Sequence, residues 1–168
     1  MSKIDELIQE YCPEGVEFKE LGAVCEVANN KRKPVKSSLR TSGDIPYYGA
    51  NNIQDYVDGY THDGEYVLIA EDGSASLQNY SIQFVTGKFW ANNHVHVVRG
   101  INEIENRFLF HFLSGMNFAT YLTGGTRAKL NKAKLVEIKI PVPPLEVQKE
   151  IVKILDMFTQ LEAEQIGR

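Results

Sequence analysis

Residues 135–161 read LVEIKIPVPPLEVQKEIVKILDMFTQL, and the hydrophobic pattern of this stretch changes at its prolines. Residues 135–140 alternate apolar and polar side chains, which predicts a strand that the following prolines end. Beyond Pro144, apolar side chains recur at spacings of 4, 3, 4 and 3, as in a coiled-coil seam. The seam residues are Val147, Ile151, Ile154, Phe158 and Leu161. We therefore expect a domain over residues 1–143 and an amphipathic coiled-coil-type helix over residues 144–168, which projects and pairs with a partner.

Before residue 135, some segments of the chain show the apolar spacing of a helix and others show the alternation of a strand. Apolar residues recur every fourth position in residues 103–122, which predicts a helix that faces the core, either continuous or interrupted at Gly115. Residues 4–11 also have helical spacing. Alternating or continuous apolar runs predict short strands over residues 16–21, 65–70, 81–85 and 94–98. Residues 31–44 contain little apolar material and predict an exposed loop. The expected fold class is therefore α/β, a mixed sheet with the 103–122 helix packed on it.

The composition is that of a soluble globular protein. Of 168 residues, 43% are hydrophobic and 24% are charged, which excludes a disordered chain. No apolar run approaches the roughly 20 residues that span a bilayer, and the polar N-terminus is unlike a signal peptide. We therefore expect a cytoplasmic protein without a membrane partner. Two cysteines, Cys12 and Cys25, are too few for a disulfide framework or a zinc site.

Charge is distributed unevenly along the chain. The net charge is −4, yet residues 31–40 carry five basic residues and no acidic one. Residues 127–140 carry five basic residues against Glu137 alone. Two basic segments in an acidic chain either form one positive surface for a nucleic acid or remain two solvated loops, and charge alone favours neither. Aromatic and amide residues follow the first segment in YYGANN at 47–52, where we expect one of the two tyrosines to be buried.

A search for catalytic motifs finds none. The chain lacks a phosphate-binding Gly-x-x-x-x-Gly-Lys-Ser/Thr loop, a nucleophile turn and the residues that would flank Pro143-Pro144 in an adenine methyltransferase. Glu137-Ile138-Lys139 matches half of a metal-dependent nuclease site, but such triplets are common and would simply share one wet strand face. His94 and His96 have a spacing that metals use, yet without a third ligand we favour two polar positions on a half-exposed strand. We expect no metal site.

Several motifs resemble one known family over nearly the whole chain. The most specific combines a strand, Pro-x-Pro-Pro, Leu-Glu-x-Gln-x-x-Ile-Val and a helix in residues 138–152. The others are GVEFKELG at 15–22, IPYYGAN at 45–51, YVLIAEDGS at 66–74, WANNH at 90–94 and GGT at 124–126. Together they resemble one half of the specificity subunit of type I restriction–modification enzymes.

The resemblance implies a function that the residues alone do not indicate. A specificity subunit carries two target-recognition domains, each of which reads half of a split site in double-stranded DNA, and two long antiparallel helices space them. Modification subunits that hold S-adenosylmethionine methylate adenine, and a restriction subunit translocates and cuts the DNA. The resemblance thus implies a non-catalytic chain without a cofactor of its own, since S-adenosylmethionine, ATP and Mg belong to the partner subunits.

The resemblance and the charge pattern together give candidate DNA-binding residues. Basic side chains neutralise phosphates, whereas amides, hydroxyls and aromatic rings contact base edges and grooves. The phosphate candidates are Lys31, Arg32, Lys33, Lys36 and Arg40, followed by Arg127, Lys129 and Lys132. The base or groove candidates are Tyr48, Asn51, Asn52, Ser74, Asn92, Asn93 and Thr126. We expect both groups to line one cationic groove.

The chain departs from the family pattern in two ways, which determine the assembly that we expect. The chain has one recognition domain where the family subunit has two, and its seam is short. We therefore expect a half-subunit or a fragment that pairs through the C-terminal helix with a second copy or another half. A homodimer would favour a DNA site with inverted identical halves. Two rival functions stay open: an assembly module that acts through the C-terminal helix without binding DNA, and a metal-dependent nuclease built on Glu137.

Overall fold

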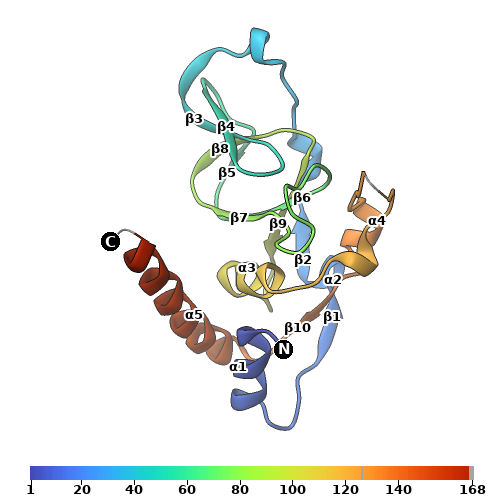
Figure 1. The fold of residues 1–168 in the computed structure, drawn as a ribbon, viewed down its shortest axis with the longest axis vertical. Helices are drawn as coiled ribbons and strands as arrows, with labels where there is room; N and C mark the ends of the chain where they lie inside the picture. The colour runs from blue at the N-terminus through green and yellow to red at the C-terminus, as the bar shows by residue number, and fades with distance from the viewer. Residues whose placement is uncertain (126, 167–168) are drawn as a thin grey trace.

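The computed structural model describes residues 1–125 and 127–166, which form three sheets with helices at one end (Figure 1). The strands are β1 (Phe18–Glu20), β2 (Cys25–Val27), β3 (Ser42–Tyr48), β4 (Ile53–Val57), β5 (His62–Asp63), β6 (Tyr66–Ala70), β7 (Ile82–Val85), β8 (Lys88–Ala91), β9 (Val95–Gly100) and β10 (Lys139–Pro141). The helices are α1 (Lys3–Tyr11), α2 (Leu21–Val24), α3 (Asn106–Ser114), α4 (Lys132–Leu135) and α5 (Leu145–Ile166). Short 3₁₀ segments are η1 (Asn29–Lys31), η2 (Ser37–Leu39) and η3 (Ala119–Tyr121).

The central sheet has the strand order β2-β9-β6-β7, and each neighbouring pair is antiparallel. All five residues of β6 are buried, because both faces of the sheet are covered, and this explains its unbroken apolar sequence. Val67 and Ile69 belong to a core shared with α1, α3 and α5, whereas Tyr66 and Leu68 belong to a second core. Since successive strand side chains point to opposite faces, the central sheet lies between two cores.

The second core joins the central sheet to a smaller sheet of order β4-β3-β8-β5 at the top of Figure 1. Phe89 of β8 lies in this core, and its ring stacks on the buried His62 ring with centroids 5.1 Å apart. β3 and β8 are parallel neighbours, so the segments that follow them leave the sheet at the same edge. Residues 49–52 and 92–94 therefore emerge side by side.

The larger core lies at the end of the molecule that carries the helices. Ile4, Leu7 and Ile8 of α1 share one helix face and are buried there. Ser2 caps this helix, since its hydroxyl accepts from the Asp5 N–H. α3 buries one face in the same core, and β1 pairs antiparallel with β10 beside it. These elements form the base on which α5 begins.

α5 is anchored at its start by one buried side chain. Gln148 is completely buried and donates to the carbonyl oxygens of Glu103 and Pro143, both at 2.8 Å. Its own carbonyl accepts from the Glu105 N–H at 2.9 Å, directly before α3. Because buried polar groups are costly without partners, the hydrogen bonds to Glu103 and Glu105 fix the first turn of α5 against the residues before α3, and the bond to Pro143 holds the segment that enters the helix.

Further along α5, contact with α3 gives way to solvent. Asp156 accepts from Nε of Arg107 at 2.9 Å and from Nε2 of His111 at 2.7 Å. Burial alone would raise the pKa of Asp156, but the hydrogen bonds from His111 and Arg107 outweigh it and lower that pKa. Beyond this point Phe158 and Leu161 are 47% and 52% exposed. Only the C-terminal part of α5 therefore projects from the body.

The α/β class and the long C-terminal helix are confirmed, but several predicted elements differ in their bounds. The helix expected over 103–122 is interrupted at Gly115, the position considered for a break: α3 ends at Ser114 with Gly115 as its C-cap, and η3 follows separately. The strand predicted over 135–140 is wrong in its first part. The Asn131 side chain accepts from the Lys134 N–H and starts a helical turn, so β10 is confined to Lys139–Pro141.

The loop predicted over residues 31–44 ends earlier than expected, because β3 begins at Ser42. The neighbouring strands β4, β5 and β8 were not expected from the hydrophobic pattern. These strands are only two to five residues long, and β4 exposes Ile53 and Tyr56 as well as Gln54, so no clear alternation marks them. Across residues 1–125 and 127–166, no helix combines the length and the apolar character that a bilayer crossing requires.

Candidate nucleic-acid interface

A groove of about 690 Å³ opens between the small top sheet and the loop that precedes α4. Its walls come from residues 50–54 after β3, residues 72–77 after β6, His94 after β8, and residues 127–129. The parallel arrangement of β3 and β8 explains why the first and third of these segments meet. The groove thus combines cationic, amide, carboxylate and imidazole side chains on one concave surface.

Backbone hydrogen bonds hold the two ends of the loop over residues 123–130 together. The backbones of Thr123 and Lys129 exchange hydrogen bonds at 2.9 and 2.7 Å, which closes the loop. Gly124 has a φ of +96°, and a Cβ there would lie 2.6 Å from the Arg127 carbonyl oxygen, so the turn requires glycine. Arg127 and Lys129 are exposed and are presented together at one edge of the groove.

Two of the predicted base or groove candidates line the groove, but internal hydrogen bonds use their polar atoms. Asn51 donates to the Gly73 carbonyl at 2.8 Å and accepts from the Ala75 N–H at 2.7 Å. The Ser74 hydroxyl donates to the Ser76 carbonyl at 2.8 Å. Asn51 and Ser74 therefore shape the groove wall by holding residues 73–76 in place.

Two further candidates serve the interior. Asn92 is buried, and its side-chain oxygen accepts from the His94 N–H at 2.8 Å. Tyr48 is half-buried and packs edge-to-face on Phe89, and burial raises the pKa of its hydroxyl. Its neighbour Tyr47 is fully buried, which confirms that one of the two tyrosines belongs to the core.

Asn52 and Asn93 are exposed and adjoin groove residues in the sequence, whereas Thr126 lies outside the described residues. Gln54, Asp72 and His94 also line the groove. The sequence leaves open whether Asp72 contacts DNA or caps a turn, and it does not indicate Gln54 or His94 as groove residues. Asp72 Oδ1 lies 2.5 Å from His94 Nδ1. Both residues lie inside quoted motifs, but their contact depends on the pairing of β6 with β9, which residue spacing does not reveal.

The basic segment at 31–40 uses its arginines and its lysines differently. Arg32 donates to the Val95 carbonyl at 3.1 Å. Arg40 donates from Nε to the Val35 carbonyl at 2.8 Å, and its guanidinium lies 4.1 Å from the centre of the Tyr47 ring. The three lysines of the segment, Lys31, Lys33 and Lys36, are exposed. The arginines therefore hold the segment on the sheet, and the lysines present its charge to solvent.

A buried polar network joins the two basic segments. His96 is fully buried, donates from Nε2 to the Leu130 carbonyl at 2.6 Å and accepts at Nδ1 from the Asn29 amide at 3.0 Å. The Glu71 carboxylate lies 3.8 Å from His96 and 3.8 Å from Arg32. Burial lowers the pKa of His96, and a neutral ring with a proton on Nε2 satisfies both of its hydrogen bonds.

The expectation that His94 and His96 share a half-exposed strand is wrong. His94 lies in the turn before β9, and His96 lies within β9, whose two faces are both covered. The apolar neighbours of His96 in the sequence indicated a strand but gave no sign that its second face was also buried.

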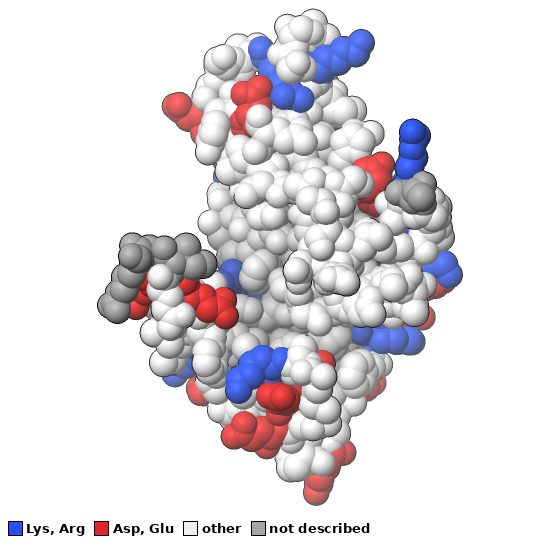
Figure 2. Space-filling model, viewed as in Figure 1, with Lys and Arg blue, Asp and Glu red and all other residues white. Residues whose placement is uncertain are grey.

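Figure 2 shows basic side chains at the top of the viewed face, over the 31–40 segment, at the right near α4, and also lower down toward the end that carries α1 and α5. Mostly uncharged surface lies between the first two of these places. Arg127 and Lys129 line the groove, whereas residues 31–40 do not. Lys132 is exposed on α4 close to the loop. The two basic segments are thus connected through the interior, but they do not line one groove.

The predicted seam of α5 is divided between the core and solvent. Ile151 is fully buried in the larger core, and Val147 and Ile154 pack partly against that core. These three residues are therefore taken up by contacts within the chain. Phe158 and Leu161 are the seam residues left exposed to a partner.

The residues of the nuclease alternative lie in ordinary surface ion pairs. Glu137 lies 3.6 Å from Lys134, and Lys139 lies 3.6 Å from Glu20. Within the described parts of the chain, no three His, Cys, Asp or Glu side chains gather as metal ligands would.

Comparison with known proteins places this groove in a named domain. A family model described as the type I restriction modification DNA specificity domain matches residues 13–167. The chain belongs to this family. A protein named as a type I restriction enzyme specificity subunit in Haemophilus influenzae is 69% identical over 149 residues, which cover 89% of this chain and 39% of the relative. The EcoprrI specificity subunit of Escherichia coli is 36% identical over 116 residues, 69% of this chain and 28% of the relative.

Solved structures of specificity subunits share the fold of this specificity domain. The subunit from M. genitalium matches with a TM-score of 0.72 at 19% identity, over 98% of this chain and 45% of that one. The subunit from Thermoanaerobacter tengcongensis matches with a TM-score of 0.68 at 20% identity, over 96% of this chain and 43% of that one. This specificity domain thus spans less than half the length of these relatives.

Proposed function

We propose that this specificity domain binds double-stranded DNA and that the groove is its recognition surface. The observation that carries the proposal is the placement of exposed Arg127 and Lys129 on the same concave surface as Gln54, Asp72 and His94. Cationic side chains attract the phosphate backbone, and amide, carboxylate and imidazole groups suit base edges. Membership of a family described by its DNA specificity supports the same function.

The acidic side chain in the groove separates the two kinds of contact. Asp72 would repel a phosphate, so we assign the phosphates to the outer edge, beside Arg127 and Lys129. The Asp72 carboxylate, held by His94, is suited to accept a hydrogen bond from the amino group of cytosine. Lys132 extends the cationic edge on α4, and Lys31, Lys33 and Lys36 supply a second cluster of phosphate contacts.

The catalytic steps belong, in this proposal, to other chains. We assign adenine methylation to modification subunits that hold S-adenosylmethionine, and ATP- and Mg-dependent cleavage to a restriction subunit. The specificity domain then acts as a non-enzymatic component that supplies the DNA address. The support is the membership of a family described by its DNA specificity.

We assign assembly to the exposed end of α5. Met157, Phe158 and Leu161 are 63%, 47% and 52% exposed and lie on the part of the helix that leaves the body. Large apolar side chains grouped on a projecting helix favour pairing with a second helix. A second copy of this chain or another half-subunit would complete a two-domain DNA reader. This surface is also the one that the rival function, a pure assembly module, would use.

Duplex binding across a range of salt concentrations tests the proposal. The probe is a dye-labelled duplex of mixed sequence, and the readout is fluorescence anisotropy. We expect log K to fall linearly with log salt concentration, because bound lysines and arginines release counterions from the DNA. Changing Lys31, Lys33 and Lys36 together to alanine should lower the slope by up to about three units, since each phosphate contact contributes about 0.9.

The matched control is a triple change of Lys139, Lys149 and Lys153 to alanine, which removes the same charge from exposed positions on β10 and α5. We expect this control to keep the slope. Equal slopes for both triple variants would show that the basic segment is only a solvated loop. Absence of duplex binding would favour the assembly module, and Mg-dependent DNA cleavage that Glu137→Ala abolishes would favour the nuclease.

A further inference from the structure

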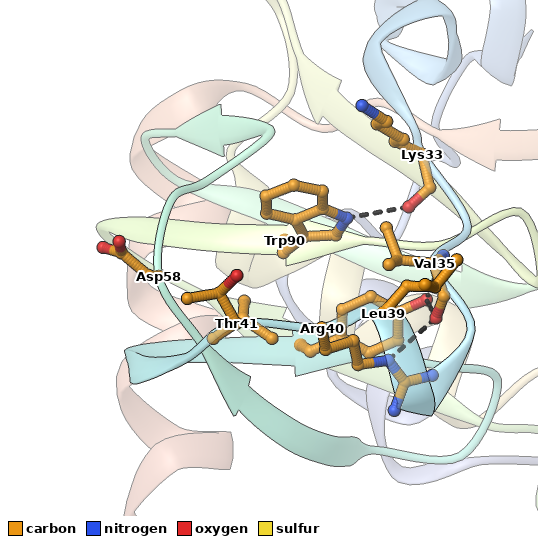
Figure 3. A pocket seen from close by; sticks show the side chains of 9 residues that line it. Lys33, Val35, Leu39, Arg40, Thr41, Asp58 and Trp90 are labelled. Carbon is orange, nitrogen blue, oxygen red and sulfur yellow. Dashed lines mark hydrogen bonds between the residues drawn. The ribbon is translucent and has the colours of Figure 1, made fainter.

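A second cavity lies at the top of the molecule and shares no lining residue with the groove. It has a volume of about 200 Å³ and opens between β8 and the segment that leads into β3 (Figure 3). Figure 3 shows the Trp90 ring on one side of this cavity and Leu39, Arg40 and Thr41 on the other. Asp58 lies at one end.

Hydrogen bonds fix the walls of this Trp90 cavity. The Trp90 indole donates from Nε1 to the Lys33 carbonyl at 2.7 Å. The Tyr47 hydroxyl accepts from the Val35 N–H at 3.1 Å, and Arg40 Nε donates to the Val35 carbonyl at 2.8 Å. Three planar side chains from three segments are therefore held in position, which lowers the entropic cost of binding a ligand.

The walls of the cavity are planar and its rim is polar. The Trp90 and Tyr47 rings are inclined by 29° with centroids 6.5 Å apart, and the Arg40 guanidinium lies 4.1 Å from the centre of the Tyr47 ring. Aromatic and guanidinium planes are the groups on which flat ring systems stack. The Thr41 hydroxyl and the Asp58 carboxylate add hydrogen-bonding groups for the edge of such a ring.

The size of the cavity limits its occupant. Sites for drug-sized ligands measure roughly 300–1,000 Å³, so about 200 Å³ admits one ring system and leaves the rest of its molecule outside. Lys33 contributes to the lining, and Lys31 and Lys36 are exposed in the same segment. A small cavity with planar walls, on a segment that carries three exposed lysines, matches a base whose neighbouring phosphates remain outside.

We infer that the Trp90 cavity receives a single nucleobase that has left the stack of the bound DNA. The base stacks on Trp90, and the phosphates beside it lie near the lysines. This inference deepens the proposed function, because the DNA supplies the base. A free nucleotide would engage fewer of the lysines, and an apolar protein side chain would need neither the lysines nor Asp58. Unstacking costs least for a base that is already unpaired, so an unpaired base is the best probe.

The test compares three dye-labelled duplexes of one mixed sequence with the full 168-residue chain. The first duplex is fully paired, the second has one extra unpaired adenine, and the third has one extra abasic nucleotide at the same place. The third keeps the additional phosphate and the flexibility but lacks the base. We expect the adenine bulge to bind about tenfold more tightly than the abasic bulge, from stacking on the aromatic wall. Trp90 is the chain's one tryptophan, so its emission reports occupancy directly, and only the adenine bulge should quench it.

A cavity-filling variant provides the second arm. Thr41 is exposed, and the Asp58 N–H donates to its backbone carbonyl, a contact that survives substitution. Thr41→Phe should therefore fill the cavity, remove the tenfold preference and leave affinity for the paired duplex unchanged. Thr86→Phe, at an exposed threonine in the turn between β7 and β8, is the matched control and should keep the preference.

Equal binding of the two bulges by the unchanged chain would overturn the inference, and so would a preference that persists in a folded Thr41→Phe variant. If that variant does not fold, the Trp90 emission of the unchanged chain tests the inference, which fails if the adenine bulge does not quench that emission. If the chain binds duplexes but the unpaired base has no effect, the inference about the Trp90 cavity is wrong and the proposed function stands. Quenching by dAMP without binding of any duplex contradicts the proposed function and DNA as the source of the base.

Discussion

At the scale of single residues, the chemistry of the basic side chains decides where they act. The guanidinium of Arg40 is planar and carries several donors, so it serves a carbonyl oxygen and an aromatic face at the same time. Arg32 likewise serves backbone carbonyls. The ammonium group of lysine is a compact, strongly hydrated charge, which suits an exposed phosphate contact. The arginines of the segment at 31–40 thus anchor it, and its lysines leave their charge exposed to solvent.

Lys129 provides the sharpest single-residue prediction. Its backbone closes the loop at 123–130, while its exposed side chain lines the groove. Lys129→Ala should weaken binding to every duplex and lower the slope of log K against log salt concentration by about one unit. Lys139→Ala, on β10 and paired with Glu20, is the control that should keep the slope. A slope unchanged in Lys129→Ala would remove this residue from the phosphate contacts.

His96 makes stability depend on pH. Burial lowers the pKa of His96, so below about pH 6.5 the unfolded chain takes up a proton that the native chain excludes. The free energy of unfolding should therefore fall as pH decreases from 7 toward 5. His96→Gln should reduce this slope, measured by urea unfolding at several pH values. Burial also lowers the pKa of His62 and His111, so part of the slope should persist. A slope identical to that of the unchanged chain would contradict this role of His96.

The sequence revealed the types of binding groups better than their positions. The basic residues of both segments are visible in the sequence, and Lys129 does reach the groove. Asn92 is buried and Tyr48 is half-buried because of how the strands pair. The amino-acid types in these segments do not indicate that burial. Gln54 enters the groove only because β3 and β4 bring it there, and a single glutamine in a polar stretch carries no signal of its own.

At the scale of elements, α5 combines an anchor with a free end. Gln148→Ala would leave the Glu103 and Pro143 carbonyls and the Glu105 N–H without their partner. Since an unsatisfied buried group costs about 1–3 kcal/mol, the variant should lose about 3 kcal/mol of unfolding free energy in urea titrations. Gln160→Ala, on the exposed part of α5, should change stability by less than about 0.5 kcal/mol. Equal stabilities of the two variants would show that Gln148 does not anchor the helix.

The exposed end of α5 leads to a prediction about association. Phe158→Ser combined with Leu161→Ser should leave the unfolding free energy nearly unchanged, because both side chains are about half exposed. The same double variant should weaken self-association, measured by sedimentation velocity over a range of concentrations. The unchanged chain should associate as concentration rises. If it sediments as a monomer at every concentration, pairing between copies through this surface is excluded.

Helices and strands with strong periodicity could be predicted from the sequence. Features that depend on how several elements pack together could not. The strand expected over 65–70 is β6, Tyr66–Ala70, and the long helix begins directly after Pro144, as expected. The seam pattern did not distinguish a helix that packs on its own domain from one that packs on a partner. Ile151 follows the same spacing as Phe158, and only the placement of α1 and α3 buries the first and exposes the second.

At the scale of the whole molecule, the central sheet connects the groove, the Trp90 cavity and the base of α5. One of its faces supports the core that anchors α5, and the other supports the small sheet that carries the Trp90 cavity and one wall of the groove. The buried His96 network crosses this region and links both basic segments. The groove and the exposed end of α5 therefore rest on one continuous scaffold.

The most direct test of the proposed DNA recognition is a methylation map of plasmid DNA exposed to modification subunits with and without this chain. We predict adenine methylation at one recurring sequence only when the chain is present, with inverted identical halves if two copies of the chain pair. A map that is the same with and without the chain, although the subunits assemble with it, would contradict the claim that this domain supplies the DNA address.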